Sequence, residues 1–198
     1  MPRLTLTDLV DIVSRAGSPK ATKVREIKNR PAYAPAQDFY KGLREGLVEL
    51  HRLKQGKPAL SPLASPPDAK KTAHYASAVA GYKKWWGQKS LSWFDPPRNI
   101  YSAHGIEVAV NPTLGLHING LPHVITLHLK SDKLTKVRAD LICELMAVAL
   151  SPSAPANAVM CVLDVRNSKL FVAGAGSQGL QAMINAELAY VASLWPYV

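Results

Sequence analysis

The stretch GIEVAVNPTLGLHINGLPHVITLHLK, residues 105–130, decides the fold of this chain. Apolar and polar residues alternate along it, which is typical of β-strands that bury one face. We expect three strands in a meander, because two short interruptions divide the alternation. The second interruption, Asn119-Gly120, favours a type I′ hairpin turn, since both residues tolerate positive φ angles. The sequence therefore predicts an antiparallel sheet in this part of the chain.

The hairpin turn also predicts which side chains share the polar face of this sheet. With Asn119 and Gly120 as the turn residues, Asn111 lies opposite His128, and Lys130 follows two positions further along the same face. An amide, an imidazole and an ammonium group then gather at one end of the hairpin. These three residues are the candidate catalytic residues of the chain.

Helical and apolar patterns surround the predicted strands. Before them, helices are expected after Thr5 or Thr7 as far as Ser14, over residues 20–29, after Asp38 as far as Lys54, and from Asp68 to about Lys89. After them, we expect a helix with an apolar stripe from Leu134 to Val148, a strand over residues 158–165 buried on both faces, a short strand over residues 170–173, and a helix from about Ser177 to Leu194. The predicted fold class is α+β: a mixed sheet, made of the meander and a further hairpin, flanked by helices.

Charge divides the chain into two regions. The 198 residues include 24 Lys and Arg and 14 Asp and Glu, a net charge of +10, and residues 1–100 hold 18 of these basic residues and 8 of the acidic ones. We expect a basic, mostly helical region over residues 1–98, with an exposed Pro-rich loop at 55–68, and an α/β core over residues 99–198; the two are also compatible with packing as one domain. A basic region favours an anionic partner, most commonly nucleic acid, and a merely solvated basic surface is the alternative.

One predicted helix combines basic and aromatic residues. Its buried stripe is expected to consist of aromatic residues at helical spacing, Tyr75, Tyr82 and Trp86. Trp85 lies off that stripe beside Lys83 and Lys84, where a ring can stack on bases and lysines can neutralise phosphates. These three residues are candidate nucleic-acid contacts. The basic segment nearer the N-terminus adds five more, Lys20, Lys23, Arg25, Lys28 and Arg30.

The order helix, three meandering strands, helix, strand, over roughly residues 100–165, resembles the core of the PD-(D/E)XK nuclease superfamily. In that family an Asp on the second strand and a (D/E)-x-K motif on the third hold Mg²⁺, and the Lys helps to position or activate the attacking water. Here Asn111 falls at or just before the Asp position, and His128-Leu129-Lys130 stands in the place of (D/E)-x-K. The Lys matches, but both carboxylates are replaced by groups that suit Mg²⁺ poorly. The resemblance implies a nuclease-like fold with a degenerate site that holds no metal.

A glycine motif elsewhere raises the question of a nucleotide cofactor. The stretch LFVAGAGSQGLQAM, residues 170–183, contains the G-x-G-x-x-G spacing of dinucleotide-binding loops. That fingerprint requires a following strand and an acidic residue about 20 positions further on. Only a single predicted helix follows Gly179, and its one acid is Glu187. We therefore expect no dinucleotide cofactor and interpret the motif as a strand-to-helix connection in which Ser177 caps the helix.

Other features bear on metal binding and location. Four of the six histidines fall between residues 104 and 128, but the predicted register separates them, so no zinc site is expected. Cys143 and Cys161 both lie in apolar runs, which favours free thiols in a reducing cytoplasm. No apolar stretch is long enough to span a bilayer and the first residues do not resemble a signal peptide, so we expect a cytoplasmic protein with no membrane partner.

Three functions remain open at this stage. The first is a nucleic-acid-binding protein on a nuclease-like core without metal or other cofactor. The second is an active, divergent nuclease that uses Mg²⁺, with acids supplied by Glu107, Asp140 or Asp164. The third is a non-enzymatic protein-interaction or structural protein. The uneven charge favours the first.

Overall fold

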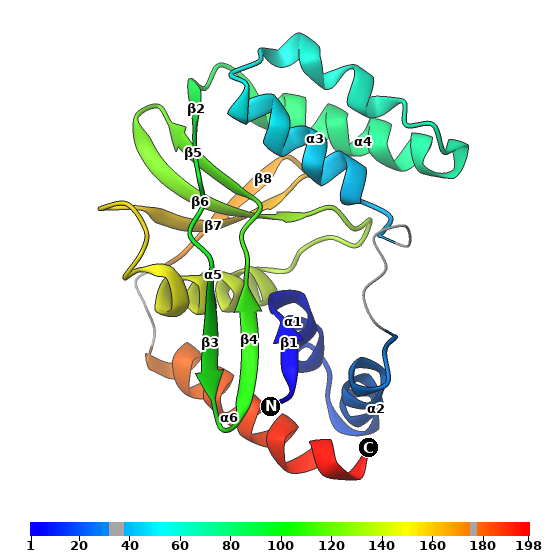
Figure 1. Ribbon diagram of the computed structural model, residues 1–198, viewed down its shortest axis with the longest axis vertical. Coiled ribbons are helices and arrows are strands. Elements are labelled where there is room, and N and C mark those ends of the chain that lie inside the picture. The colour runs from blue at the N-terminus through cyan, green and yellow to red at the C-terminus, as the bar shows by residue number, and fades with distance from the viewer. Residues whose placement is uncertain (32–37, 175–177) are drawn as a thin grey trace.

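The computed structural model describes residues 1–31, 38–174 and 178–198, which build two mixed β-sheets and the helices that cover them (Figure 1). A three-stranded sheet has the strand order β1-β4-β3, and a five-stranded sheet has the order β2-β5-β6-β7-β8. In chain order the strands are β1 (Arg3–Thr5), β2 (Leu91–Phe94), β3 (Asn99–Ala103), β4 (Ile106–Val110), β5 (Leu114–Ile118), β6 (Leu121–His128), β7 (Val159–Asp164) and β8 (Lys169–Val172). The α+β fold class is confirmed.

Helices cover both faces of the five-stranded sheet. In chain order the α-helices of the described residues are α1 (Leu6–Val13), α2 (Gly17–Lys28), α3 (Lys41–Arg52), α4 (Ala69–Trp86), α5 (Lys136–Leu150) and α6 (Gln178–Leu194). The short 3-10 helices are η2 (Lys57–Leu60), η3 (Pro62–Ala64) and η4 (Trp195–Tyr197). Figure 1 shows α3 and α4 above the five-stranded sheet and α5 below it, with α2 and α6 at the lower end of the molecule. Residues 175–177 of the glycine motif, including the expected cap Ser177, lie outside the described residues.

The β5–β6 hairpin has the predicted register. Ile118 pairs with Leu121, and the turn residues Asn119 and Gly120 have φ angles of 51° and 91°. This turn conformation is the one that Asn-Gly favours, because asparagine and glycine enter the positive-φ region at little cost. A local sequence signal was therefore sufficient to fix the pairing of these two strands.

The expected place of the preceding strand is wrong. Strand β4 does not pair with β5; it pairs antiparallel with β3 and parallel with β1. The turn between β3 and β4, at His104 and Gly105, has φ angles of 52° and 74° and closes a separate hairpin. Strand β2, which we did not expect, takes the place next to β5 instead. Strands β2 and β3 are half-buried or exposed along most of their length and so lack a clean apolar alternation.

Strands β6 and β7 run parallel, and α5 connects them. Their last paired residues are His128 and Asp164, so both strands end at the same edge of the sheet. The expectation that β7 is buried on both faces is confirmed, since neighbouring residues contribute to different apolar clusters. Val162 packs with α1, α5 and α6, whereas Leu163 packs with α3 and α4. The five-stranded sheet thus separates two apolar cores, one against α3 and α4 and the other against α1, α5 and α6.

The Pro-rich stretch at 55–68 is not exposed throughout, contrary to expectation. It forms η2 and η3, which pack against α4, and Leu60 is only 1% exposed. On its other side α4 approaches the turn between β7 and β8, where Gly81 lies against backbone atoms of Val165 and Arg166. The hydroxyl of Ser168 donates to the carbonyl of Gly81 at 2.8 Å. Helix α4 is therefore held closely on two sides.

Candidate nucleic-acid interface

A basic face lies on α4, whose sequence contains four lysines and no acidic residue. Asp68 caps the helix by accepting the backbone N–H of Lys70 at 3.0 Å. Lys70, Lys83 and Lys84 are exposed, and no carboxylate of the described residues pairs with their ammonium groups. Lys70 and Lys84 are fourteen residues apart, close to four helical turns, so they lie on the same side of α4 about 21 Å from each other.

Small side chains occupy the outward face of α4 between these lysines. The exposed residues there are Ala73, Ala76, Ser77 and Ala80. None of them projects far from the helix, so an extended anionic chain can approach the helix backbone while its phosphates reach the lysines at both ends. The exposed face of α4 thus has lysines at both ends and short, uncharged side chains between them.

Trp85 belongs to the core, and its predicted role as a surface contact is wrong. Its side chain is only 4% exposed, and its ring lies 5.1 Å from the ring of Tyr82. Helix α4 is covered by α3 as well as by the sheet, so its buried face is wider than the single stripe that the spacing of Tyr75, Tyr82 and Trp86 indicated. Those three residues are buried as expected.

A second basic group lies beyond the ends of β6 and β7. Arg166 donates from Nε to the carbonyl of Leu129 at 3.2 Å, and from Nη2 to the hydroxyl of Tyr40 at 3.1 Å and to Nδ1 of His74 at 2.8 Å. All three acceptors are neutral. Because no carboxylate in the described part of the chain pairs with Arg166, its positive charge is not compensated by a direct partner.

Aromatic contacts hold Tyr40 in place beside this arginine. The hydroxyl of Tyr75 donates to the carbonyl of Phe39 at 2.8 Å, and the Phe39 and Tyr40 rings meet edge to face at 4.8 Å. The ammonium group of Lys71 lies 5.6 Å from the centre of the Phe39 ring. Sequence reasoning missed Arg166, but its place just past a buried parallel strand was a usable signal, since ligands bind outside the carboxyl ends of such strands.

The structure does not bring the three candidate catalytic residues into one site. Pairing of β5 with β6 starts at Leu114 and Ile125, so Asn111 lies beyond the ladder and not opposite His128. Asn111 lines a groove of about 260 Å³, and His128 and Lys130 line a neighbouring cavity of about 40 Å³ that shares Thr7, Thr126 and Leu127 with it. The predicted register fails at Asn111 because this residue belongs to the segment that connects β4, in the other sheet, to the start of β5.

The polar groups of His128 and Lys130 already have partners within the chain. His128 donates from Nε2 to the carbonyl of Asp132 at 2.6 Å. The ammonium group of Lys130 lies 3.6 Å from the carboxylate of Asp11 on α1, which also pairs with Arg138 at 2.7 Å. Helix α1 thus covers the polar face of the sheet and fixes the expected catalytic lysine. A catalytic role for these residues stays a prediction.

Most basic side chains of the 20–30 segment bind groups within this chain, and their role as nucleic-acid contacts stays a prediction. Four of the five bind groups elsewhere: Lys20 pairs with Glu187 at 2.6 Å, Lys23 with Asp11 at 3.9 Å, Lys28 donates to the carbonyl of Trp195 at 2.7 Å, and Arg30 makes two 2.9 Å bonds to Asp8. Burial opposes ionisation of Asp8, but hydrogen bonds from Arg30 and Thr5 outweigh it and lower its pKa. Arg25 alone of the five is exposed without a side-chain partner among the described residues.

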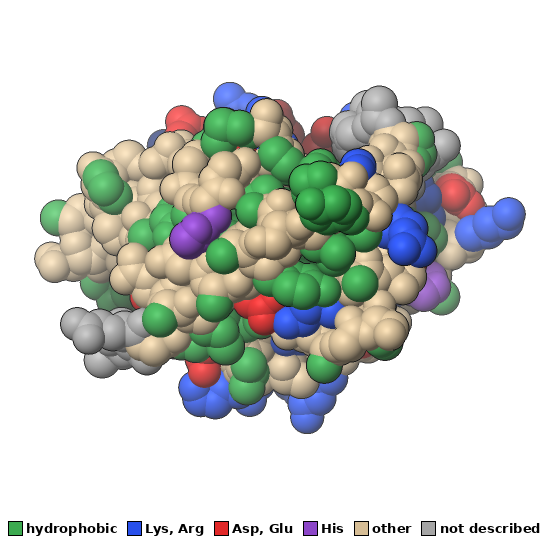
Figure 2. Space-filling model, turned by 90° about the horizontal axis from the view of Figure 1, so that it is seen from below, with side chains coloured by type: hydrophobic (Ala, Val, Ile, Leu, Met, Phe, Trp, Pro, Cys, Tyr) green, Lys and Arg blue, Asp and Glu red, His purple; other side chains and the backbone are tan. Residues whose placement is uncertain are grey.

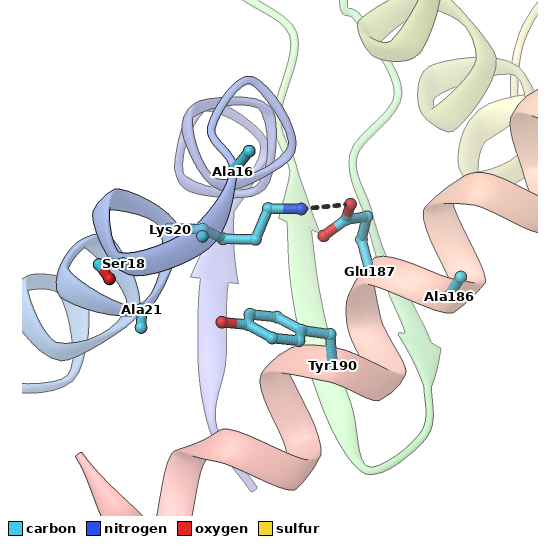
Figure 3. A pocket seen from close by; sticks show the side chains of 8 residues that line it. Ala16, Ser18, Lys20, Ala21, Ala186, Glu187 and Tyr190 are labelled. Carbon is cyan, nitrogen blue, oxygen red and sulfur yellow. Dashed lines mark hydrogen bonds and ion pairs between the residues drawn. The ribbon is translucent and has the colours of Figure 1, made fainter.

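The cavity between α2 and α6 is also lined by a lysine that is already paired with a carboxylate. It has a volume of about 520 Å³, and Figure 3 shows Lys20 reaching across it to Glu187, with Tyr190 beside them. The ammonium group of Lys20 also lies 5.5 Å from the centre of the Tyr190 ring. A lysine that is already paired in this way is a weak receptor for an anion, so we leave this cavity outside the interface.

The lower end of the molecule has a different character from α4. Figure 2 shows hydrophobic side chains over the middle of this face, and Lys and Arg mainly toward its margins. Helix α6 and the η4 turn, which lie at this end in Figure 1, contribute Tyr190 and Tyr197, which are 37% and 85% exposed. A basic interface is therefore expected at the α4 end and not here.

The acids considered for an active nuclease have structural partners. Asp140 pairs with Lys136 at 2.6 Å, and Asp164 is 1% exposed and accepts the backbone N–H of Leu134. Glu107 lies in the other sheet, on β4. Across the described ranges no group of three or more His, Cys, Asp or Glu side chains is placed to hold a metal ion.

Comparison with protein-family models and with curated protein sequences finds no match for this chain. Among the helices that the structure describes, none is both long and apolar enough to cross a bilayer.

Proposed function

We propose that this protein binds nucleic acid through the phosphate backbone, on the face formed by α4 and the β7–β8 turn. One observation carries the proposal: Lys70, Lys83, Lys84 and Arg166 are accessible cations, and no carboxylate in the described chain neutralises them. Phosphate contacts of this kind supply most of the affinity of sequence-independent binding. On α2, by contrast, Lys20 and Lys23 are paired with carboxylates, and Arg25 is the one exposed cation of the five candidates in the 20–30 segment without a side-chain partner among the described residues.

The binding mode follows from the chemistry of this face. Its side chains are cationic or small, and Trp85 is buried, so stacking on bases is not part of the proposal. A span of about 21 Å from Lys70 to Lys84 corresponds to about six nucleotides at 3.4 Å per nucleotide of one strand. The proposed ligand is therefore a short stretch of one strand, recognised by charge and not by base identity.

The strand order supports a nuclease-like core beneath this face. Strands β2, β5 and β6 are antiparallel neighbours that follow α4, and β7 joins parallel to β6 after α5. In the sheet, β2, β5, β6 and β7 are neighbours in the order that the resemblance to PD-(D/E)XK nucleases implies, but β3 and β4 of the other sheet stand between β2 and β5 in the chain. The proposal includes a core that has lost its metal ligands, and a cytoplasmic location, which the buried free thiols Cys143 and Cys161 support.

The experiment is a salt titration of binding to fluorescent oligonucleotides of single- and double-stranded DNA and RNA. For single strands, each lost phosphate contact lowers the slope of log K against log salt by about 0.7. The double variant Lys83→Ala/Lys84→Ala should therefore lower that slope by about 1.4. The matched control, Arg3→Ala/Arg15→Ala, removes two exposed cations far from α4 and should leave the slope unchanged.

Each other outcome has a defined meaning. Absence of binding even at about 50 mM salt would refute the proposal and favour the protein-interaction alternative. An equal loss of slope in the control would show that net charge, and not the α4 face, determines binding. Cleavage that requires Mg²⁺ or Mn²⁺ and is abolished by Lys130→Ala would replace the proposal with the nuclease alternative.

A further inference from the structure

Arg166 is held in a way that leaves part of its guanidinium group free. Its Nε and Nη2 are occupied by Leu129, Tyr40 and His74, whereas the described chain offers no acceptor to Nη1. An arginine that is oriented by neutral acceptors keeps its full charge and presents its remaining N–H groups in a fixed geometry. A carboxylate partner would have cancelled that charge.

The partners of Arg166 add donors of their own. Because Arg166 can only donate, Nδ1 of His74 must accept, and the ring proton of His74 therefore lies on Nε2. The hydroxyl of Tyr40 accepts from Arg166, so its own proton is available to a ligand. Two protons on Nη1 and one on Tyr40 make three unused donors beside one uncompensated charge, and the Nε2 proton of His74 lies on the side of its ring away from Arg166.

The position of these donors in the fold also indicates a ligand site. Arg166 and Leu129, whose carbonyl it binds, both lie just past the last paired residues of the parallel strands β6 and β7. Ligands in sheets of this kind bind outside the carboxyl ends of the strands. Tyr40 and Arg166 both lie in turns, but the ring contact of Phe39 with Tyr40 and the three hydrogen bonds of Arg166 hold these donors in place before any ligand arrives.

We propose that Arg166, His74 and Tyr40 form a subsite for a phosphate monoester. Such a group has three acceptor oxygens and close to two negative charges, which match three donors and a cation better than the two free oxygens of an internal phosphodiester. The source of the phosphate rests on the proposed function: it is the terminal phosphate of a nucleic acid strand that lies along α4. His74 and Lys70, one helical turn apart, connect the subsite to that face.

The test compares oligonucleotides of about six nucleotides that end in a phosphate or in a hydroxyl group, at either end. The wild-type protein should bind one phosphorylated form about tenfold more tightly than its hydroxyl counterpart. Arg166→Gln should abolish this preference, and Tyr40→Phe, which removes one hydroxyl and disturbs the fold least, should reduce it. Lys169→Gln is the matched control, since it removes one exposed cation three residues from Arg166, at the start of β8, and should keep the preference.

The outcomes separate this inference from the proposed function. Binding of oligonucleotides without any preference for a terminal phosphate would overturn the subsite and leave the proposed function in place. If no oligonucleotide binds, but inorganic phosphate or a nucleoside monophosphate raises the Tm of the wild type and not of Arg166→Gln, the subsite stands and the proposed function fails. A preference that survives both Arg166→Gln and Tyr40→Phe, or that Lys169→Gln also abolishes, would overturn the subsite.

Discussion

Replacing Gly81 by Ala should separate α4 from the β7–β8 turn. A Cβ atom at this position would lie 2.1 Å from the carbonyl oxygen of Val165 and 3.0 Å from Cα of Arg166. Both are backbone atoms, so they cannot rotate out of the way. Since non-bonded carbon contacts are most favourable at about 3.5–4.0 Å, the helix and the turn would have to move apart by about 1.5 Å.

The expected magnitude follows from two opposing effects. Overpacking of a well-packed contact costs about 1–3 kcal/mol, and a backbone clash belongs at the upper end of that range. Replacing a glycine in a helix interior by alanine returns about 1 kcal/mol. The free energy of unfolding of Gly81→Ala should therefore fall by about 2 kcal/mol, and its Tm by about 4–8 °C.

The assay is urea unfolding followed by tryptophan fluorescence, with a thermal melt beside it. The control is Gly42→Ala in α3, where the nearest atom to the new Cβ is the Tyr75 hydroxyl oxygen at an ordinary 3.6 Å. This variant should be more stable than the wild type by about 0.5–1 kcal/mol, because only the helix propensity changes. If Gly81→Ala is as stable as Gly42→Ala, the close approach of α4 to the turn is not a feature of the folded protein.

Two further predictions concern buried titratable groups. Burial lowers the pKa of His51 from 6.5 to about 4, so between these pH values the unfolded chain binds more protons than the folded protein. The free energy of unfolding should fall by up to about 3 kcal/mol as the pH drops through this range. For His51→Gln, the free energy of unfolding measured at several pH values should depend less on pH than that of the wild type. If the two proteins show the same pH dependence, burial of a neutral His51 is contradicted. Burial also raises the pKa of Cys143 to about 12 and that of Cys161 above its usual value, so neither thiol of the native protein should react with a thiol reagent at pH 8, whereas both should react in urea. Rapid modification of the native protein would contradict this prediction.

Local signals in the sequence predicted the parts of the fold that local interactions determine. The Asn119-Gly120 turn fixed the register of β5 and β6, and Thr5 caps α1, with Asp8 as its partner in a capping box. Strand β4 was placed in the wrong sheet because one partner, β1, lies far away in the sequence and the other, β3, lacks the apolar alternation that would have revealed it. Alternation shows that a strand has a buried face, but it does not identify the neighbouring strand.

The candidate interface was predicted only in part, for a related reason. Lys83 and Lys84 are exposed because their side of α4 has no neighbour, and the helical pattern indicated as much. The commitment of Arg30 to Asp8 depends on how α2 folds against α1, which no spacing in the sequence reveals. Trp85 was misplaced because a helix with two neighbours buries more than one stripe.

The parallel pairing of β1 with β4 has a consequence for how the protein folds. Arg3 pairs with Glu107, so the three-stranded sheet closes a loop that contains α1 to α4 and two further strands. The entropy of closing such a loop must be overcome before the pairing returns any stability, and folding slows as such distant contacts increase. During synthesis, β1 emerges long before its partner, so it must wait unpaired until β4 has formed its hairpin with β3. The order in which the chain is made is therefore not the order in which its sheets can be completed.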